Sequence, residues 1–232
     1  MQRLADDPKA PFPDPAACKH PDGLVAYGGD LSVERVLLAY ENAIFPWYSA
    51  GSPILWWSPD PRPVFDVKNH VPNRRLRRTL RKPWHITLDS SFGAVIRACA
   101  APRAGQPDTW ITHAMIGCYE KLHELGFAHS VEVWWEGQLA GGLYGVSLGR
   151  VFFAESKFHR VRDASKVALI HLIAQLRAWD FSYVDCQVIS PHLENLGATL
   201  LSRRSLQLAV SAGLAKKPTH PHHLPGLWSM DP

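Results

Sequence analysis

The spacing of hydrophobic and polar residues changes about halfway along the chain. In the first half, apolar residues recur at the spacing of amphipathic helices, and in the second half short runs indicate strands. The helical pattern covers residues 32–42, 91–100 and 113–125, with Ser32 as an N-cap and Gly126 as a C-cap signal. The strand pattern predicts a hairpin of residues 130–135 and 139–147 around Glu136-Gly137, followed by a strand at 151–155.

A helix and further strands follow the hairpin. Residues 164–179 are apolar nearly all round, which is typical of a helix buried between layers, although a helix that forms one wall of an apolar pocket gives the same pattern. Strands are expected at 183–189 and around 206–210, with a short helical turn near Pro191 between them. This order of elements predicts an α+β fold, α/β-like, with a mixed sheet.

Prolines set the first part of the chain apart. Residues 44–48 and 53–63 hold so many prolines that we expect a packed, irregular segment there rather than a helix or a central strand. The composition changes between about residues 65 and 85. We therefore predict a small N-terminal domain, residues 1–70, and a larger domain, residues 71–232.

The composition excludes several classes of protein. The 232 residues are 46% apolar and include nine tryptophans, which excludes a disordered chain. The apolar runs are too short for a transmembrane helix, and the first residues do not resemble a secretory signal. Four cysteines without CxxC spacing predict reduced thiols, and with them a cytoplasmic protein without a disulfide scaffold or a zinc site. His220, His222 and His223 lie in a proline-rich tail and are expected to face solvent.

Positive charge is concentrated in one segment. The net charge is only +4, but no acid lies between Asp66 and Asp89, where seven lysines and arginines gather. Residues 73–82 predict a short helix with Leu76 and Leu80 on its buried side. Because no acid lies three or four residues away to offset these cations, a phosphate backbone is a better partner for them than solvent alone.

Polar side chains on apolar strands are the candidates for chemistry. Glu155 ends one predicted strand, and Asp185 and Gln187 stand two residues apart on another, so the latter two would share a sheet face. A carboxylate in such a place must be hydrogen-bonded or functional, and for Asp185 the pairing with a buried arginine or the capping of a helix is an equally open alternative. Tryptophans in loop-like segments, among them Trp47 and Trp110, suit the stacking of unpaired bases, although core packing is the commoner role of any single tryptophan.

Several strings occur in an order and spacing that resemble one protein family. They are PDGLVAYGGDLS at 21–32, AIFPW at 43–47, PILWWSPDPR at 53–62, TWIT at 109–112, GGLYG at 141–145, ES at 155–156 and DCQ at 185–187. From about Pro21 to Leu201 the chain resembles the bacterial leucyl/phenylalanyl-tRNA–protein transferases. The resemblance implies transfer of Leu, Phe or Met from aminoacyl-tRNA to proteins with N-terminal Arg or Lys, which marks them for degradation by the N-end rule. It also implies a small N-terminal domain joined to a C-terminal domain like that of the GNAT acetyltransferases.

The same resemblance assigns roles to individual residues. Asp185, Gln187 and Glu155 match the family's catalytic residues, and Trp47 and Trp110 match the residues that stack the terminal adenosine. The amino-acid pocket would be lined by Leu143, Leu169, Leu172, Leu176 and Val184, and tRNA would bind at Arg74, Arg75, Arg77, Arg78, Arg81 and Lys82. We expect no cofactor, no metal, no membrane partner and a monomer. Lys157 departs from the family, which has an apolar residue after Glu-Ser, and a cation there would alter side-chain preference or extend outward.

An ester that is already activated explains why no nucleophilic motif is found. The attacking group would be the α-amine of the acceptor, whose ordinary pKa of about 7.7–8.0 leaves a neutral fraction at physiological pH. We expect Asp185 to orient this amine and to act as base directly or through Gln187, with Glu155 holding the cationic end of the acceptor or the ribose.

Two other functions compete with this one. An acetyl-CoA-dependent N-acetyltransferase would need a glycine-rich turn before residue 164, where the chain has no glycine. A non-enzymatic RNA-binding module would use the basic helix and the tryptophans but would leave Glu155, Asp185 and Gln187 unexplained.

Overall fold

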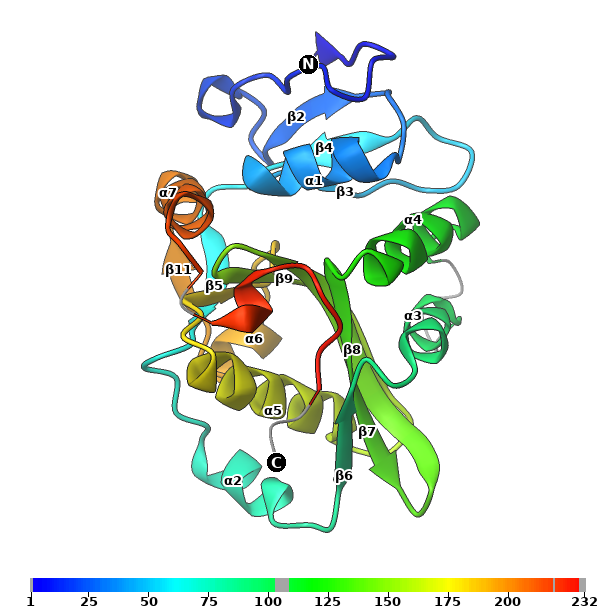
Figure 1. Cartoon of the computed structure of the whole chain (residues 1–232), viewed down its shortest axis with the longest axis vertical. Helices are drawn as coiled ribbons and strands as arrows, with labels where there is room; N and C mark the ends of the chain where they lie inside the picture. The colour runs from blue at the N-terminus through cyan, green and yellow to red at the C-terminus, as the bar shows by residue number, and fades with distance from the viewer. Residues whose placement is uncertain (1, 103–108, 219, 230–232) are drawn as a thin grey trace.

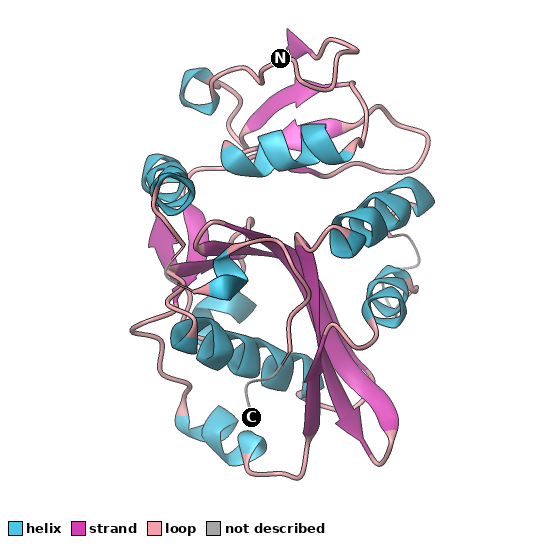
Figure 2. Cartoon of the chain, in the orientation of Figure 1, coloured by secondary structure: helices cyan, strands magenta, loops and turns pink. Residues whose placement is uncertain are grey.

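Two sheets organise the protein (Figures 1 and 2), as seen in a computed structural model that describes residues 2–102, 109–218 and 220–229. The smaller sheet has the strand order β1-β2-β4-β3. Its strands are β1 (Gln2–Arg3), β2 (Leu24–Tyr27), β3 (Phe45–Pro46) and β4 (Leu55–Trp57). Helix α1 (Val33–Glu41) lies beside it and begins after Ser32, whose side chain accepts a hydrogen bond from the backbone N–H of Arg35, so the predicted cap is confirmed.

The larger sheet has the strand order β11-β5-β10-β9-β8-β7-β6. Its strands are β5 (Arg62–Asp66), β6 (His85–Leu88), β7 (Ala128–Trp135), β8 (Gln138–Leu148), β9 (Val151–His159), β10 (Tyr183–Asp185) and β11 (Thr199–Leu201). Strands β9 and β10 run parallel, and the other neighbours run antiparallel. The predicted α+β fold with a mixed sheet and the predicted hairpin are therefore confirmed.

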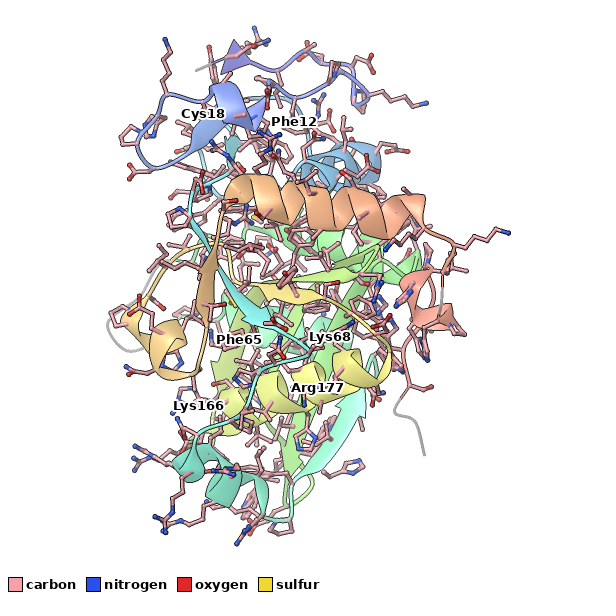
Figure 3. All side chains as sticks on the ribbon, turned by 90° about the vertical axis from the view of Figure 1, so that its left-hand side faces the viewer. Phe12, Cys18, Phe65, Lys68, Lys166 and Arg177 are labelled. Atoms are coloured by element: carbon pink, nitrogen blue, oxygen red, sulfur yellow. The ribbon has the colours of Figure 1, made fainter. Side chains whose placement is uncertain are left out.

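Helices cover both faces of the larger sheet (Figure 1). On one face lie α3 (Phe92–Ala100) and α4 (His113–Glu124), and on the other lies α5 (Ala164–Ala178). Helix α5 is apolar nearly all round, and this allows Leu169, Leu172 and neighbouring residues to be buried in one core cluster. At the far end of α5, the side chain of Arg177 donates hydrogen bonds of 2.7 Å to the carbonyl oxygens of Val67 and His70 (Figure 3).

The proline-rich segment is more regular than predicted. Strand β4 is an inner strand of the smaller sheet, and β5, which contains Pro63, pairs with both β10 and β11. The expectation of an irregular segment without a central strand was therefore wrong. Both strands are short, and Pro63 takes part through its carbonyl oxygen, which accepts a hydrogen bond of 2.9 Å from the N–H of Cys186, so its missing N–H costs nothing there.

The end of the chain also differs from the prediction. The predicted strand around 206–210 is part of helix α7 (Arg203–Ala215), and Leu206 and Val210, four residues apart, bury their side chains on one helix face. The predicted strand at 183–189 ends at Asp185. The helical turn near Pro191 is confirmed as α6 (Pro191–Asn195).

Trp228 and the histidines of the tail pack against the rest of the chain, although Leu224 and Leu227 are exposed. Trp228 is only 3% exposed and stacks on the ring of His129, with 3.7 Å between the ring centroids. His222 packs against Trp179, and the Nε2 atom of His223 lies 2.6 Å from the carbonyl oxygen of Trp179. The prediction of solvent-facing histidines was wrong in part, because aromatic neighbours from distant parts of the chain pack against them and leave them half-buried.

The two sheets divide the chain near the predicted domain boundary. Because β5 belongs to the larger sheet, the strands change from one sheet to the other between Trp57 and Arg62. The division into residues 1–70 and 71–232 stays a prediction. In the part of the chain that the structure describes, no helix is long and apolar enough to span a membrane.

Candidate active site

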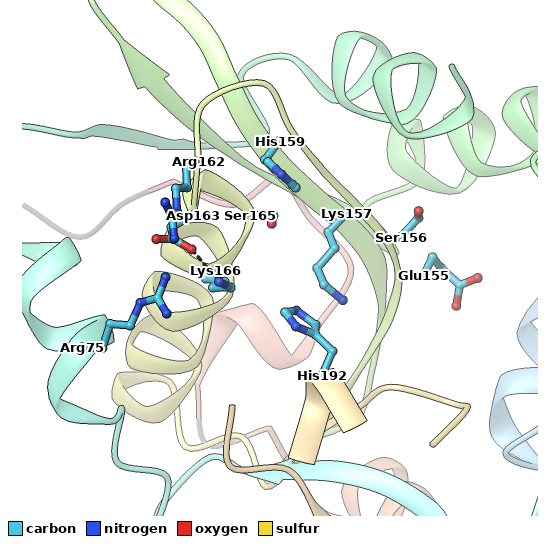
Figure 4. Close-up of a pocket in the computed structure, with 10 residues that line it drawn as sticks. All are labelled: Arg75, Glu155, Ser156, Lys157, His159, Arg162, Asp163, Ser165, Lys166 and His192. Atoms are coloured by element: carbon cyan, nitrogen blue, oxygen red, sulfur yellow. Dashed lines mark hydrogen bonds and ion pairs between the residues drawn. The ribbon is translucent and has the colours of Figure 1, made fainter. Parts of the chain in front are cut away.

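A hollow opens where two strands of the larger sheet separate. The last pair between β9 and β10 is Phe153 with Asp185, but β9 continues to His159 and pairs there only with β8. A cavity of about 490 Å³ lies along this free edge (Figure 4). Its lining residues are Arg75, Glu155, Ser156, Lys157, His159, Arg162, Asp163, Ser165, Lys166 and His192.

A β-bulge places Glu155 at this hollow. In the pairing of β8 with β9, Tyr144 faces Ser156 and Gly145 faces Ala154, so Glu155 has no partner across the ladder. A bulge of this kind re-aims a side chain away from the regular alternation. The close approach requires Gly145, since a Cβ atom there would lie 2.1 Å from the carbonyl oxygen of Phe153.

Both carboxylate oxygens of Glu155 accept hydrogen bonds. The amide Nε2 of Gln187 donates to Oε1, and the hydroxyl of Tyr119 donates to Oε2 at 2.8 Å. The hydroxyl of Tyr40 lies 2.6 Å from that of Tyr119. Burial raises the pKa of Glu155 from its ordinary value of 4.5 to about 7, against the opposing effect of these hydrogen bonds. Glu155 is therefore able to take up or release a proton near neutral pH.

Asp185 forms the buried ion pair that the sequence left open as an alternative. Its side chain is 0% exposed, and its two oxygens lie 3.1 and 2.5 Å from the Nε and Nη2 atoms of Arg62. The third contact of Arg62 is a hydrogen bond of 2.6 Å to the carbonyl oxygen of Ala43. Burial raises the pKa of Asp185, while the guanidinium of Arg62 acts in the opposite direction.

Gln187 leaves the strand in a conformation that turns it toward Glu155. Its φ angle of 63° lies in the left-handed region, which is uncommon for a residue other than glycine. The backbone N–H of Gln187 is 3.4 Å from Oδ1 of Asp185. Asp185 and Gln187 therefore do not project from one face of a regular strand as predicted. Instead, the carboxylate of Asp185, which is paired with Arg62, contacts the backbone N–H of Gln187.

The predicted amino-acid pocket is a packed cluster. Leu143, Leu169, Leu172, Leu176 and Val184 lie in the same core cluster, and each is at most 3% exposed. Leu143 is paired with Lys157 across β8 and β9, so the two side chains share one face of the sheet. The structure brings the five residues together beside the hollow, where Lys157 is one of the lining residues.

Trp47 and Trp110 line a second hollow. This cavity of about 870 Å³ is bordered by both tryptophans and by Trp57. Trp47 is 43% exposed, and its ring centroid lies 6.1 Å from that of Trp57. The indole N–H of Trp57 donates a hydrogen bond of 2.8 Å to the carbonyl oxygen of Trp47, which fixes the two residues relative to each other. An exposed indole face held in this way suits the stacking of a base.

The basic helix forms as predicted. Helix α2 (Arg74–Leu80) is capped by Asn73, whose side chain accepts a hydrogen bond from the N–H of Leu76, and Leu76 is buried beneath it. A shallow hollow of about 720 Å³ is lined by Arg74, Arg75, Arg77, Arg78 and Arg81. Lys82 lies over the rings of Trp84 and Trp135 instead. Among the described residues, no carboxylate forms an ion pair with these cations.

Three residues of the site were not predicted from the sequence. Tyr40 and Tyr119 hold Glu155 from helices α1 and α4, and Arg62 holds Asp185 from β5. An arginine within the proline-rich string was the one available signal for Arg62, whereas tyrosines in amphipathic helices are usual core residues. In the described ranges, no three or more His, Cys, Asp and Glu side chains gather as a metal site would require.

Comparison with known proteins identifies the family. The family description "Leucyl/phenylalanyl-tRNA protein transferase" matches residues 64–210, and that of its N-terminal domain matches residues 29–60. The chain belongs to this family. The leucyl/phenylalanyl-tRNA–protein transferase of Cellvibrio japonicus (strain Ueda107) is 54% identical over 198 residues, which are 84% of each chain. The protein of that name from Chromobacterium violaceum is 52% identical over 201 residues, 86% of each chain.

Membership of this family makes the chain an aminoacyltransferase, as the sequence implied. Its relatives are named for the transfer of leucyl and phenylalanyl groups from tRNA to protein. Solved structures similar to the chain include acetyltransferases. One is a GCN5-related N-acetyltransferase-like protein from Streptococcus suis, with a TM-score of 0.35 and 14% identity, covering 70% of this chain and 61% of that chain.

Proposed function

We propose that the chain transfers Leu, and also Phe and Met, from aminoacyl-tRNA to the α-amine of proteins that begin with Arg or Lys, which marks them for N-end rule degradation. The observation that carries this proposal is the buried Glu155–Gln187 pair at the hollow, with a carboxyl group whose pKa is about 7. Two further features of the chain suit a charged tRNA, namely the aromatic cavity at Trp47 and the basic helix α2, whose Arg75 also lines the hollow.

The reaction moves one proton from the amine to the ribose oxygen by way of the enzyme, and it forms no covalent intermediate on the enzyme. The α-amine nitrogen of the acceptor forms a bond to the carbonyl carbon of the aminoacyl ester, and the bond from that carbon to the ribose oxygen breaks. Glu155 takes the proton that the amine loses, and this proton then passes to the ribose oxygen as it leaves. Gln187 supports the developing tetrahedral centre, because its amide is anchored on Glu155.

Asp185 has a different role in this proposal from the one that the sequence suggested. Its carboxylate is fully buried and bound to Arg62, so it does not reach an incoming amine. We assign it as a positioning residue that holds the backbone of Gln187 in its left-handed conformation. The negative charge of ionised Glu155 also favours the cationic N-terminus of an Arg or Lys acceptor.

The leucyl or phenylalanyl side chain enters the cluster of Leu143, Leu169, Leu172, Leu176 and Val184. Because these residues are packed together, the donor side chain enters only as they separate. Once the cluster opens, the aliphatic residues at 172 and 176 would give room for a side chain with an unbranched Cβ, and a misfit of one methylene costs about 1–3 kcal/mol. We further propose that the enzyme acts as a monomer, and that it acts in the cytoplasm because its donor is a tRNA.

One assay separates this function from its competitors. The protein is incubated with Leu-tRNA and a peptide that begins with Arg, and with the same peptide and acetyl-CoA. Formation of the Leu-Arg peptide only with the tRNA supports the proposal, whereas acetylation of the peptide or binding of tRNA without transfer contradicts it. Binding of tRNA should weaken steeply with salt, because released counterions accompany each phosphate contact. A salt dependence near zero would remove the role proposed for the arginines of α2.

A further inference from the structure

The hollow at Glu155 is continuous with the arginines of α2. A smaller cavity of about 250 Å³ shares Arg75, Asp163, Lys166 and His192 with the hollow at Glu155. Arg75 also borders the hollow formed by the α2 arginines. Figure 4 shows Arg75 at one end of the first cavity and Glu155 at the other. The outer hollow adjoins the other two at Arg75, and we call the three hollows together the basic groove, which extends from the surface of α2 to the proposed reaction centre.

Positive charge continues along the inner part of this groove. The cavity is lined by four basic side chains, Arg75, Lys157, Arg162 and Lys166, together with His159 and His192. The carboxylates there are Asp163, which is 2.5 Å from the Nζ atom of Lys166, and Glu155, which is half protonated near neutral pH. Four cations against two carboxylates leave an excess of positive charge, so the cavity favours an anion.

The N-terminus of helix α5 and the hydroxyl group of Ser165 lie at the same wall, although the N–H of Ala164 is already bonded to the carbonyl oxygen of Val161. Its first residues, Ala164 and Ser165, stand at the N-terminus of a fifteen-residue helix, where the dipole favours negative charge. Asp163 adopts a left-handed conformation and makes no capping hydrogen bond to this helix. The side chain of Ser165 lines the cavity although the residue is only 6% exposed, and Figure 4 shows its oxygen on the side of the open space.

We propose that the basic groove binds the phosphates of the single-stranded 3′ end of the tRNA, with Lys157, Arg162 and Lys166 as their partners. This inference rests on the proposed function and names a site for the donor beyond α2 and the stacked adenosine. The acceptor polypeptide is the other molecule that must reach Glu155, but its N-terminus carries an ammonium group and a cationic side chain. Four cations repel such an end, so the acceptor approaches Glu155 from outside the groove.

This proposal gives a role to Lys157, the residue at which the chain departs from the family. Its backbone pairs with that of Leu143 at the edge of the apolar cluster, and its side chain extends into the cavity (Figure 4). A cation at this point binds a phosphate close to the ester without entering the slot for the amino-acid side chain. The departure noted in the sequence is thus a phosphate contact in this chain.

The test uses three leucylated donors of decreasing length. They are Leu-tRNA, a leucylated CCA trinucleotide, and leucyl-adenosine, which has no phosphodiester. The double variant Lys157→Gln/Arg162→Gln is compared with the parent and with Lys217→Gln, a matched loss of an exposed lysine outside the groove. Arg78 lines the outer hollow at α2 but neither of the two inner hollows, so Arg78→Gln serves as a comparator. Circular dichroism and thermal unfolding confirm that each variant is folded.

The double variant is expected to lower kcat/KM by about a hundredfold or more for Leu-tRNA and for the trinucleotide, since two charged hydrogen bonds are lost. Transfer from leucyl-adenosine should stay at the level of the parent. The plot of log affinity against log salt has a negative slope, and its magnitude should decrease by about 0.7 for each phosphate contact removed. Arg78→Gln should lower kcat/KM for Leu-tRNA far more than for the trinucleotide. Lys217→Gln should have the same kcat/KM as the parent with all three donors.

Three results would overturn the assignment. They are a trinucleotide that is unaffected by the double variant, an equal loss with leucyl-adenosine, and an effect confined to the KM of the acceptor peptide, which would make the groove the acceptor site. Failure of the proposed function is a separate result, because it appears as no transfer by the parent. Binding of the uncharged trinucleotide, followed by fluorescence anisotropy, then still tests the groove: equal affinity of parent and double variant rejects it.

Discussion

Replacing Glu155 with Gln tests the electrostatics of the site through the stability of the fold. In the folded protein the pKa of Glu155 is about 7, against an ordinary value of 4.5, so the difference is 7 − 4.5, or about 2.5 pH units. At 1.36 kcal/mol per unit, this corresponds to about 3 kcal/mol. Because the pKa is raised on folding, the stabilisation is fully present below pH 4.5 and is lost as the pH rises through 7.

Glu155→Gln removes this titration while it keeps the shape of the side chain. We expect the difference in free energy of unfolding, parent minus variant, to fall by about 2 kcal/mol between about pH 5.5 and about pH 8.5, the part of the titration that is accessible without acid unfolding. Urea denaturation at several pH values measures the difference. Glu41→Gln, at an exposed position of α1, is the matched control and should show no such trend.

The pH dependence of the transfer reaction is a second test of Glu155→Gln. If Glu155 accepts the proton of the amine, kcat/KM of the parent falls below about pH 7 as the carboxylate is protonated. The variant should keep only the dependence that comes from the amine itself. A difference in unfolding free energy that is constant with pH would refute the raised pKa, and an unchanged pH profile of transfer would refute the role as base.

Four further expectations concern other parts of the site. Arg62→Met leaves the carboxylate of Asp185 buried and unpaired, which should cost about 3–5 kcal/mol in urea denaturation; adding Asp185→Leu should recover most of it, and an additive loss would contradict this. Trp47→Ala should weaken leucyl-adenosine, measured as KM, by about 1–3 kcal/mol, and an unchanged KM would exclude stacking there. Trp228→Ala should cost about 3–5 kcal/mol of stability but leave transfer per folded molecule unchanged; a stability within about 0.5 kcal/mol of the parent would show that the tail is not packed. Leu176→Ala should shift competition between Leu-tRNA and Phe-tRNA toward Phe by enlarging the slot, and an unchanged product ratio would place residue 176 outside it.

Local patterns predicted the elements well where the periodicity is long and uninterrupted. The hairpin β7–β8 and helices α3, α4 and α5 follow from spacing and caps alone. The run around Leu206 to Val210 was misread, because five mostly apolar residues fit a short strand and a helix face equally well. The prolines near Pro63 hid β5, since a short strand can accept hydrogen bonds through a proline carbonyl.

The candidate site was predictable in its residue types but not in its connections. Motifs drew attention to Glu155, Asp185 and Gln187, and Gln187 contacts both of the others. The ion pair of Asp185 with Arg62 spans 123 positions in the sequence, and no local pattern reports a contact of that range. The bulge that turns Glu155 depends on the register between β8 and β9, which only the assembled sheet defines.

One buried guanidinium has a consequence for chimaeric proteins. Arg62 binds Ala43, from the segment that leads into β3 of the smaller sheet, and Asp185, at the end of β10 in the larger sheet. The aromatic cavity at Trp47 belongs to the first of these regions and Glu155 to the second. An exchange of N-terminal halves between two relatives would therefore preserve the spacing from adenine to ester only if the joint keeps this three-way contact. A crossover placed between Ala43 and Arg62 would combine the two ends of the contact from different parents, whereas one placed upstream of Ala43 would transfer it intact.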